Sequence, residues 1–250
     1  MRLPKLSRYA CYYGTGRLPA LTAYDLVILQ ALHYTPAEIA WLRQRRVIPI
    51  AYLALGEEPS STPPAIWSLV DAQTGRVAYN PTWQTTLVDC RFPAWHAHLL
   101  QARIPEIVAR GFPGLFLDTL DVQEQYPDTR PGVVKLVAAI HAHYPDLILI
   151  ANRGFSILGE IESLLDAFLF EAFTTQYAAG AYVAWQGADL RWTAQQAAYL
   201  QTISGQRPVL ALDYAAPQDH DLRRLALARA QAHGFLSSVT TWSIDWLPEG

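Results

Sequence analysis

Three carboxylates interrupt or close apolar segments of this sequence. Asp118 and Asp121 stand at the end of GLFLDTLD (114–121), and Glu171 interrupts AFLFEAF (167–173). An unpaired carboxylate is costly to bury, so packing alone does not account for these residues. Two carboxyl groups in contrasting surroundings are what acid–base and nucleophilic chemistry needs.

The surroundings of the two segments differ. Glu171 lies among Phe and Ala residues, and an apolar setting raises the pKa of a carboxyl group and suits it to donate a proton near neutral pH. Asp118 is expected beside Asn152 and Arg153, in a more polar neighbourhood where it stays ionised. Glycoside hydrolysis requires one group that protonates the leaving oxygen and one that attacks or activates water.

Most of these residues also have a structural interpretation. Asp118 could cap a helix or pair with Arg153, and Asp121 could be a loop or capping residue. Glu57, in LALGEE, could bind substrate or pair with an arginine. The same alternatives apply to Asp213 in ALDYA.

Eight apolar segments recur along the chain and predict eight strands. Most are almost continuously apolar rather than alternating, which is typical of parallel strands covered by helices on both faces. The segments are 9–14, 25–30, 47–57, 114–121, 147–154, 167–173, 208–215 and 235–242.

Helical patterns separate most of these segments. TPAE (35–38) combines a capping box with a proline in the first turn. Thr193 with Gln196 predicts a second capped helix start, and Gly205 suits the end of that helix. Further helices are expected at about residues 94–110, 132–143, 156–165 and 218–233.

The alternation of strands and helices predicts an α/β fold, a (β/α)8 TIM barrel formed by residues 1–250 as a single domain. Two segments depart from the regular pattern. GTGRLPALTAY, after the first strand, is too short for a full helix, and residues 58–92 show no sustained period. We expect 58–92 to be a long loop after the third strand that lies over the barrel mouth.

In a (β/α)8 enzyme the active site lies at the carboxyl ends of the strands, and here nearly every predicted strand ends in a polar or aromatic residue. Asp118 and Glu171 are the catalytic candidates. The candidates for substrate binding are Tyr13, Glu57, Asp121, Asn152, Arg153, Asp213, Tyr214 and Trp242. Aromatic faces can stack on sugar rings, and four tryptophans lie in predicted loops or at a strand end: Trp83, Trp185, Trp192 and Trp242.

The sequence lacks the residues that several other kinds of catalysis require. The pairs His96/His98 and His141/His143 have i, i+2 spacing on predicted helices, which points the rings to different faces, and no metal site is predicted. The chain has only two lysines and neither ends a strand, which argues against Schiff-base and pyridoxal chemistry. No organic cofactor is expected.

The charge and hydropathy of the chain argue against nucleic acid and a membrane as partners. The net charge of −3 and the absence of long basic segments argue against nucleic acid. No segment is apolar over the length of a bilayer, and the start lacks the apolar segment of a signal peptide. We expect a soluble protein, secreted if a leader has been removed and otherwise cytoplasmic. Cys11 and Cys90 could pair, but free buried thiols are the simpler interpretation.

Six segments in this order resemble glycoside hydrolase family 114, the endo-α-1,4-polygalactosaminidase-like barrels, including their bacterial and archaeal branch. They are YYG, YLALGE, PTWQTTLVDCRFPAW, GFPGLFLDTLD, ANRG and FLFEAF. The resemblance covers nearly the whole chain, and its most specific part is G-x-F-L-D-x-x-D followed about fifty residues later by F-E. It implies a (β/α)8 fold, hydrolysis of an α-linked galactosamine-rich polysaccharide, and no metal or organic cofactor.

By position, the resemblance implies that Asp118 is the nucleophile and Glu171 the general acid/base of a retaining mechanism. It also implies that Asn152 hydrogen-bonds in the donor sugar subsite and that Glu57 lines the pocket. ANRG lacks the Lys-Asn pair of the secreted fungal members, which leaves the exact glycan open. A deacetylated galactosamine polymer is cationic, so Asp121 would either cap the following loop or attract substrate ammonium groups.

Two other functions fit the same residues. A non-catalytic glycan-binding barrel would keep the aromatic and acidic side chains without turnover. A barrel hydrolase could act on another linkage or another bond, although a metal-dependent deacetylase would need a His/Asp ligand set that the sequence does not offer. Loss of product formation in Asp118→Ala and Glu171→Ala would separate an enzyme from a binding protein.

Overall fold

A ring of eight parallel strands forms the centre of the protein. The computed structural model describes residues 3–59 and 65–248. In ring order the strands are β1 (Tyr9–Tyr12), β2 (Leu26–Leu29), β3 (Ile48–Ala54), β7 (Gly114–Asp118), β8 (Ile148–Asn152), β9 (Ala167–Glu171), β12 (Val209–Tyr214) and β13 (Leu236–Thr240). β13 lies beside β1, and the backbone amide of Tyr13 donates to Ile244 O near this seam at 2.6 Å. The (β/α)8 barrel is confirmed, with each strand inside its predicted segment.

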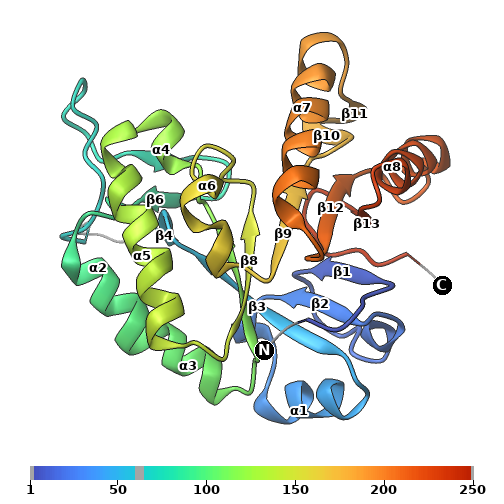
Figure 1. Ribbon diagram of the computed structural model, residues 1–250, viewed down its shortest axis with the longest axis horizontal. Coiled ribbons are helices and arrows are strands. Elements are labelled where there is room, and N and C mark those ends of the chain that lie inside the picture. Colours follow the sequence, from blue (N-terminus) through green and yellow to red (C-terminus); the bar gives the residue numbers. More distant parts are fainter. Residues whose placement is uncertain (1–2, 60–64, 249–250) are drawn as a thin grey trace.

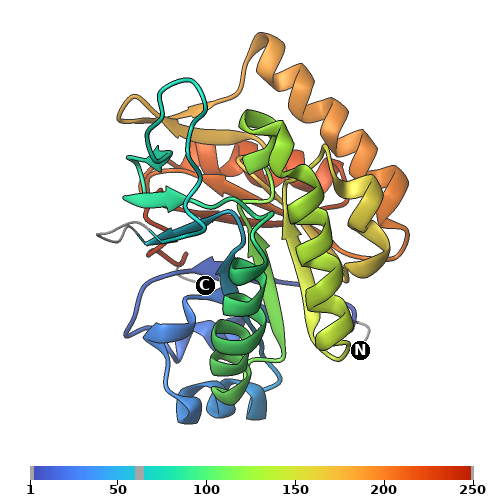
Figure 2. The ribbon, with the colours of Figure 1, turned by 90° about the vertical axis from the view of Figure 1, so that its left-hand side faces the viewer.

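Helices connect most of the strands and surround the ring (Figures 1 and 2). The α-helices are α1 (Pro36–Gln44), α2 (Pro93–His98), α3 (Ile104–Ala109), α4 (Val122–Gln125), α5 (Arg130–His143), α6 (Leu158–Ile161), α7 (Gly187–Ser204) and α8 (His220–Ala232). A π-helical turn, Leu99–Arg103, joins α2 to α3. Short 3-10 turns lie at Ala20–Ala23, Ala31–His33, Pro127–Thr129 and Glu162–Leu164, and the first of these occupies the connection predicted to be too short for a full helix.

The first capped helix start is confirmed. The Thr35 hydroxyl accepts from the Glu38 backbone amide at 3.3 Å, and the Glu38 carboxylate accepts from the Thr35 amide at 2.8 Å. Gly205 follows the last residue of α7 with φ +60°, a left-handed conformation that glycine adopts without steric cost. Both helix ends therefore follow from local sequence.

The second helix start was predicted wrongly. α7 begins at Gly187, so Thr193 lies inside the helix instead of capping it. The Thr193 hydroxyl donates to Leu190 O at 3.1 Å and accepts from the Arg229 guanidinium of α8 at 2.8 Å. A threonine hydroxyl can bond within a helix as well as cap one, and here a tertiary contact to α8 uses it.

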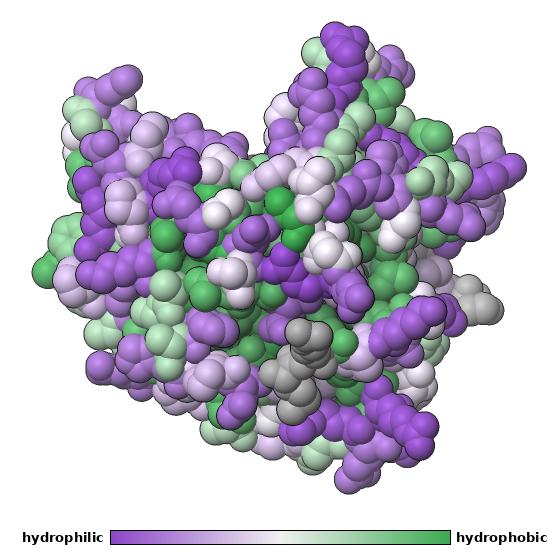
Figure 3. Space-filling view, in the orientation of Figure 1, coloured by the Kyte–Doolittle hydropathy of each residue, from purple (hydrophilic) through white to green (hydrophobic). Residues whose placement is uncertain are grey.

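Two small antiparallel sheets project beyond the ring. The insertion after β3 carries β4 (Glu57–Pro59), β5 (Tyr79–Asn80) and β6 (Thr85–Leu87), in the order β4-β6-β5. A hairpin of β10 (Thr175–Ala178) and β11 (Ala181–Ala184) follows β9. The parts of the chain that carry them rise at the upper left and upper right of Figures 1 and 3, with hydrophilic tips and a notch between them. Strands this short leave no readable period, so the sequence did not predict them.

Alternation along the barrel strands separates two apolar layers. Side chains such as Cys11, Ile28, Ile50, Phe116, Ile150, Leu169 and Leu212 form one buried cluster inside the ring. Their sequence neighbours, among them Leu117, Ala151, Phe168, Phe170 and Ala211, pack under the helices in a second cluster. Cys11 and Cys90 are buried, free thiols. In residues 3–59 and 65–248, no helix is long and apolar enough to cross a membrane.

Candidate active site

Asp118, Asn152 and Glu171 are the last residues of the neighbouring strands β7, β8 and β9. The buried cluster inside the ring contains the residues two positions earlier on these strands, which are Phe116, Ile150 and Leu169. Side chains two apart on a strand share a face, so all three polar groups point inward at the carboxyl end of the barrel. The topology thus brings together residues that are far apart in the sequence.

Each of these residues is followed by one in a left-handed backbone conformation. The φ angles are +58° at Thr119, +51° at Arg153 and +53° at Ala172. Positive φ is uncommon outside glycine, and conformations of this kind cost on the order of 1–3 kcal/mol where the surroundings enforce them. This conformation occurs directly after the last residue of three adjacent strands, β7, β8 and β9. At each position the backbone turns away after the polar side chain, which leaves that side chain at the mouth of the barrel.

One amide connects the two carboxylates. Nδ2 of Asn152 donates to Oδ1 of Asp118 at 2.7 Å and to Oε2 of Glu171 at 2.6 Å. Those two oxygens are therefore at most 5.3 Å apart, the sum of the two bond lengths. The Tyr214 hydroxyl donates to the other oxygen of Glu171 at 2.5 Å, and the Tyr52 hydroxyl hydrogen-bonds Asp118.

Burial and the negative charge of Glu171 raise the pKa of Asp118 from 3.8 to about 7. Hydrogen bonds from Asn152, from the Thr119 backbone and from Tyr52 oppose this shift without cancelling it. The expectation that Asp118 stays ionised because its neighbourhood is polar is not met in the free protein. The polar neighbours are present, but a second buried carboxylate lies among them, and two charges at this separation disfavour each other. Asp118 is therefore only partly ionised near neutral pH.

A cleft of about 420 Å³ opens above the pair. Its lining contains both catalytic candidates and five of the eight predicted substrate-binding residues: Tyr13, Glu57, Asp121, Asn152 and Arg153. Gln30, Tyr52, Ala54, Glu58, Pro59, Asn80, Trp83, Thr85, Thr119 and Ile244 complete it. Tyr52 was missed because it lies within a strand and not at its end, and its only signal was a hydroxyl in the apolar segment IPIAYLALG.

Three predicted residues lie outside that lining. Tyr214 reaches the site through its hydroxyl, and Trp242 packs edge-on against Tyr214 with ring centroids 5.4 Å apart. Asp213 is fully buried, and its Oδ1 accepts from the backbone amides of Thr174 and Thr175 at 2.6 and 2.8 Å. Adjacent strand residues face opposite sides, so Asp213 points out of the ring when Tyr214 points in. Asp213 therefore anchors the chain after β9 instead of facing the cleft.

The acidic residues on the cleft wall differ in their partners. Glu57 accepts from the Asn80 amide at 3.0 Å and from the Thr85 hydroxyl at 2.6 Å. Asp121 stands at the N-cap position of α4, but its side chain makes no capping hydrogen bond. It also lines an adjoining hollow of about 410 Å³ that includes Glu124. Within residues 3–59 and 65–248, no three His, Cys, Asp or Glu side chains gather as metal ligands.

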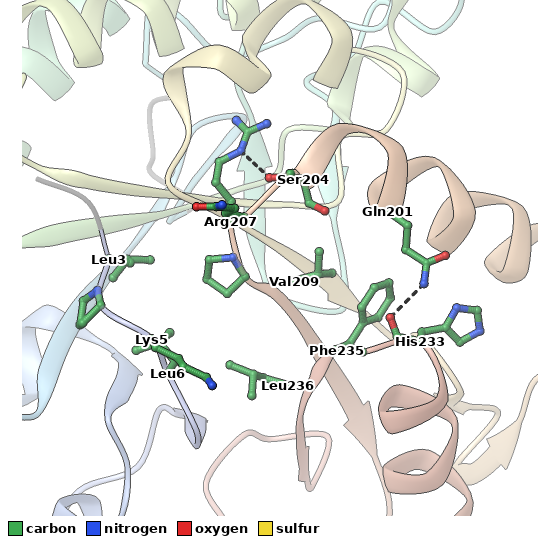
Figure 4. Close-up of a pocket in the computed structure, with 15 residues that line it drawn as sticks. Leu3, Lys5, Leu6, Gln201, Ser204, Arg207, Val209, His233, Phe235 and Leu236 are labelled. Atoms are coloured by element: carbon green, nitrogen blue, oxygen red, sulfur yellow. Dashed lines mark hydrogen bonds between the residues drawn. The ribbon is translucent and has the colours of Figure 1, made fainter.

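A separate hollow of about 540 Å³ lies near the amino-terminal ends of β12 and β13 (Figure 4). Lys5, Arg207 and His233 supply its charged or titratable side chains. The Arg207 guanidinium already donates to the Ser204 carbonyl at 3.0 Å, and Gln201 donates to the His233 carbonyl at 2.9 Å. Its lining holds no carboxylate, and catalytic groups of such barrels gather at the other end, so the cleft above Asp118 and Glu171 is the candidate active site.

Comparison with known proteins identifies the family. The profile of glycoside-hydrolase family GH114 matches residues 4–247. The glycoside hydrolase domain of PelA from Pseudomonas aeruginosa is 30% identical with a TM-score of 0.83, over 97% of this chain and 98% of that domain. Ega3 from Aspergillus fumigatus, solved with galactosamine, shares the fold at 13% identity and a TM-score of 0.69, over 95% of this chain and 91% of that one. An uncharacterized Deinococcus radiodurans protein is 27% identical over 269 residues, covering 94% of this chain and 79% of that protein. With nearly its whole length matched, the chain belongs to glycoside-hydrolase family GH114.

Proposed function

We propose that this protein is a glycosidase that hydrolyses an α-linked, galactosamine-containing polysaccharide with retention of anomeric configuration. The observation that carries the proposal is the single Asn152 amide that bonds both Asp118 and Glu171. It limits two of their oxygens to a separation of 5.3 Å or less. Retaining enzymes hold their carboxyl groups about 5–5.5 Å apart, whereas inverting enzymes leave about 6.5–9.5 Å for a water.

The proposed reaction has two displacements. In the first, a carboxylate oxygen of Asp118 bonds to the anomeric carbon while the bond from that carbon to the glycosidic oxygen breaks. The proton of Glu171 passes to the departing oxygen. In the second, Glu171 takes a proton from water as the water oxygen attacks the anomeric carbon, and the ester bond to Asp118 breaks.

This reaction needs one proton on the pair, held by Glu171. Burial comes first among the causes that raise the pKa of Asp118, and the charge of Glu171 comes second. When Glu171 holds the proton its charge is gone, and the donors Asn152 and Tyr52 favour an ionised Asp118. The active form in this proposal therefore has the proton on Glu171 and an ionised Asp118.

The charge of the cleft supports an amino-sugar substrate. Glu58 and Asp121 line it beside one cation of that lining, Arg153, and no arginine or lysine in the described ranges 3–59 and 65–248 forms an ion pair with either carboxylate. Such a wall attracts a polymer that carries ammonium groups. The galactosamine bound to Ega3, which has this fold, agrees with the same class of sugar.

Release of reducing ends from a panel of polysaccharides tests the proposal. The panel contains deacetylated and acetylated galactosamine polymers, neutral α-glucans and α-galactans. Wild type should cleave a galactosamine polymer, while Asp118→Asn and Glu171→Gln should not. Asp146→Asn, an exposed aspartate after α5, serves as the control and should match wild type.

A separate measurement tests whether the anomeric configuration is retained. Proton NMR in the first minutes of hydrolysis should show the α-anomer of the new reducing end. An initial β-anomer would overturn the retaining mechanism. Cleavage of a neutral glycan alone would overturn the substrate, and binding without cleavage would make the protein a glycan-binding barrel.

A further inference from the structure

Trp83 is an exposed indole at the edge of the cleft. It lies among the cleft's lining residues together with Asp118 and Glu171, and 47% of its surface is accessible. Most large aromatic side chains in this protein are buried or partly buried, since exposing an apolar ring to water is unfavourable. An exposed aromatic face beside two candidate catalytic carboxylates is a place where a sugar ring can pack.

The turn that carries Trp83 is held from both sides by one carboxylate. Residues 81–84 join β5 to β6, with Gln84 at φ +54°. Glu57 accepts from Asn80, immediately before the turn, and from Thr85, immediately after it. The oxygens of Glu57 therefore fix the two ends of the turn, and Glu57 serves as a positioning residue for the indole between them.

Other aromatic rings hold Trp83 from behind. The Trp83 and Trp242 rings stack with centroids 4.9 Å apart and planes inclined by 29°. Trp242 stacks in turn on Tyr177 of β10 at 5.5 Å, and its backbone amide donates to the Tyr182 hydroxyl of β11 at 3.1 Å. The insertion after β3 thus meets the β10–β11 hairpin through a row of rings, which leaves the Trp83 indole little freedom to rotate.

The same row leads to the catalytic carboxylates. Trp242 packs edge-on against Tyr214, and the Tyr214 hydroxyl donates to Glu171 at 2.5 Å. The path from Glu171 to the cleft's edge therefore runs through only three rings: Tyr214, Trp242 and Trp83. Because Trp83 also lines the cleft that holds Asp118 and Glu171, a sugar chain with one unit bound at the two carboxylates can place a later unit against the indole.

We propose that the exposed face of Trp83 is a separate subsite that stacks on a hexose ring of the polysaccharide, away from the bond being cleaved. The inference rests on the proposed function and adds to it a preference for longer chains. Short oligosaccharides fill the catalytic subsites alone. Longer ones also cover Trp83, so affinity rises with chain length until that ring is reached.

Binding to an inactive protein tests the subsite separately from turnover. In a Glu171→Gln background, calorimetry would measure the affinity for α-1,4-linked galactosamine oligosaccharides from the disaccharide to the octasaccharide. Trp83→Ala should weaken binding of the longer members roughly tenfold and leave the disaccharide unchanged. Trp83→Phe should restore most of the affinity because it keeps an aromatic face. Trp41→Ala, which removes an indole stacked by Arg45 on α1, should match the parent.

Substitutions of Glu57 test separately whether this residue positions the Trp83 indole. Glu57→Ala should reproduce the loss seen in Trp83→Ala, because the turn loses both anchors. Glu57→Gln should retain the affinity, since its amide oxygen accepts from Asn80 and its amide nitrogen donates to Thr85. An equal loss in both Glu57 variants would show that its charge binds substrate and would remove its positioning role.

The outcomes separate this inference from the proposed function. If wild type cleaves the polymer and Trp83→Ala binds every length as tightly as the parent, the subsite is wrong and the glycosidase stands. If wild type cleaves nothing while Trp83 variants weaken binding in the expected order, the subsite stands and hydrolysis is wrong. Absence of binding at every length would overturn both.

Discussion

Asp118 and Glu171 lie on strands that are not neighbours, and the strand between them supplies the group that joins them. β8 separates β7 from β9, and its last residue, Asn152, bonds a carboxylate oxygen of each. One neutral side chain thereby sets the spacing of the proposed catalytic pair. Variants of these three residues should consequently alter rate, pH dependence and stability in distinguishable ways.

The two carboxylates should have different kinetic roles. Asp118→Asn and Glu171→Gln should each lower kcat by at least about 10²–10⁴, the range for loss of a positioned catalytic group. With a substrate whose leaving group needs no proton, azide should restore turnover to Glu171→Ala and yield an α-glycosyl azide. A β-glycosyl azide from Glu171→Ala together with an α-glycosyl azide from Asp118→Ala would exchange the two roles.

Asn152→Ala should slow the reaction and move its pH profile. The hydrogen bond from Asn152 lowers the pKa of Asp118, so its removal should raise that pKa further. The acid limb, where Asp118 becomes protonated, should then move to higher pH, with kcat at the optimum reduced by about 10². A reduced rate with an unchanged acid limb would limit Asn152 to substrate binding.

Asp118→Asn should stabilise the fold above neutral pH. The pKa of Asp118 is about 7 in the folded protein and 3.8 in an unfolded chain, so the folded state binds more protons between those values. Its contribution to stability is therefore present below about pH 4 and is lost as the pH rises through about 7. At pH 8 the variant should gain on the order of 2–4 kcal/mol, and the gain should vanish near pH 4.

Thermal unfolding across pH checks this expectation. A gain of that size corresponds to a Tm several degrees above wild type, at roughly 2–4 °C per kcal/mol for a chain of this length. Asp146→Asn controls for the loss of an acidic residue at the surface. A Tm difference that is the same at every pH would show that the stabilisation does not come from titration of the buried pair.

Asp121→Asn should weaken binding of a cationic polymer in a salt-dependent manner. Asp121 lines the cleft without a capping bond, so its charge is available to substrate ammonium groups. KM should rise several-fold at about 50 mM salt and much less at about 500 mM, where screening shortens the reach of charges. Asp128→Asn, whose side chain is 90% exposed, is the matched control. An unchanged KM at low salt would exclude the electrostatic role.

Local sequence determined the parts of the fold that depend on near neighbours. Continuous apolar segments marked all eight barrel strands, because strands covered on both faces need apolar side chains on both. TPAE and Gly205 marked helix ends through hydrogen bonds and backbone freedom within a few residues. Two carboxylates at strand ends also marked Asp118 and Glu171 as candidates, since a barrel presents its strand ends at one mouth.

Tertiary structure decided what depends on contacts between distant segments. The sequence contained Asp118, Asn152 and Glu171, but only the pairing of β8 between β7 and β9 made Asn152 a bridge and brought Glu171 close enough for its charge to raise the pKa of Asp118. Strand alternation turned Tyr214 toward Glu171 and Asp213 away from the cleft, a difference of one residue that composition does not reveal. Trp83 contacts Trp242 because the insertion after β3 and the segment after β13 fold over the same mouth, and no local pattern encodes that contact.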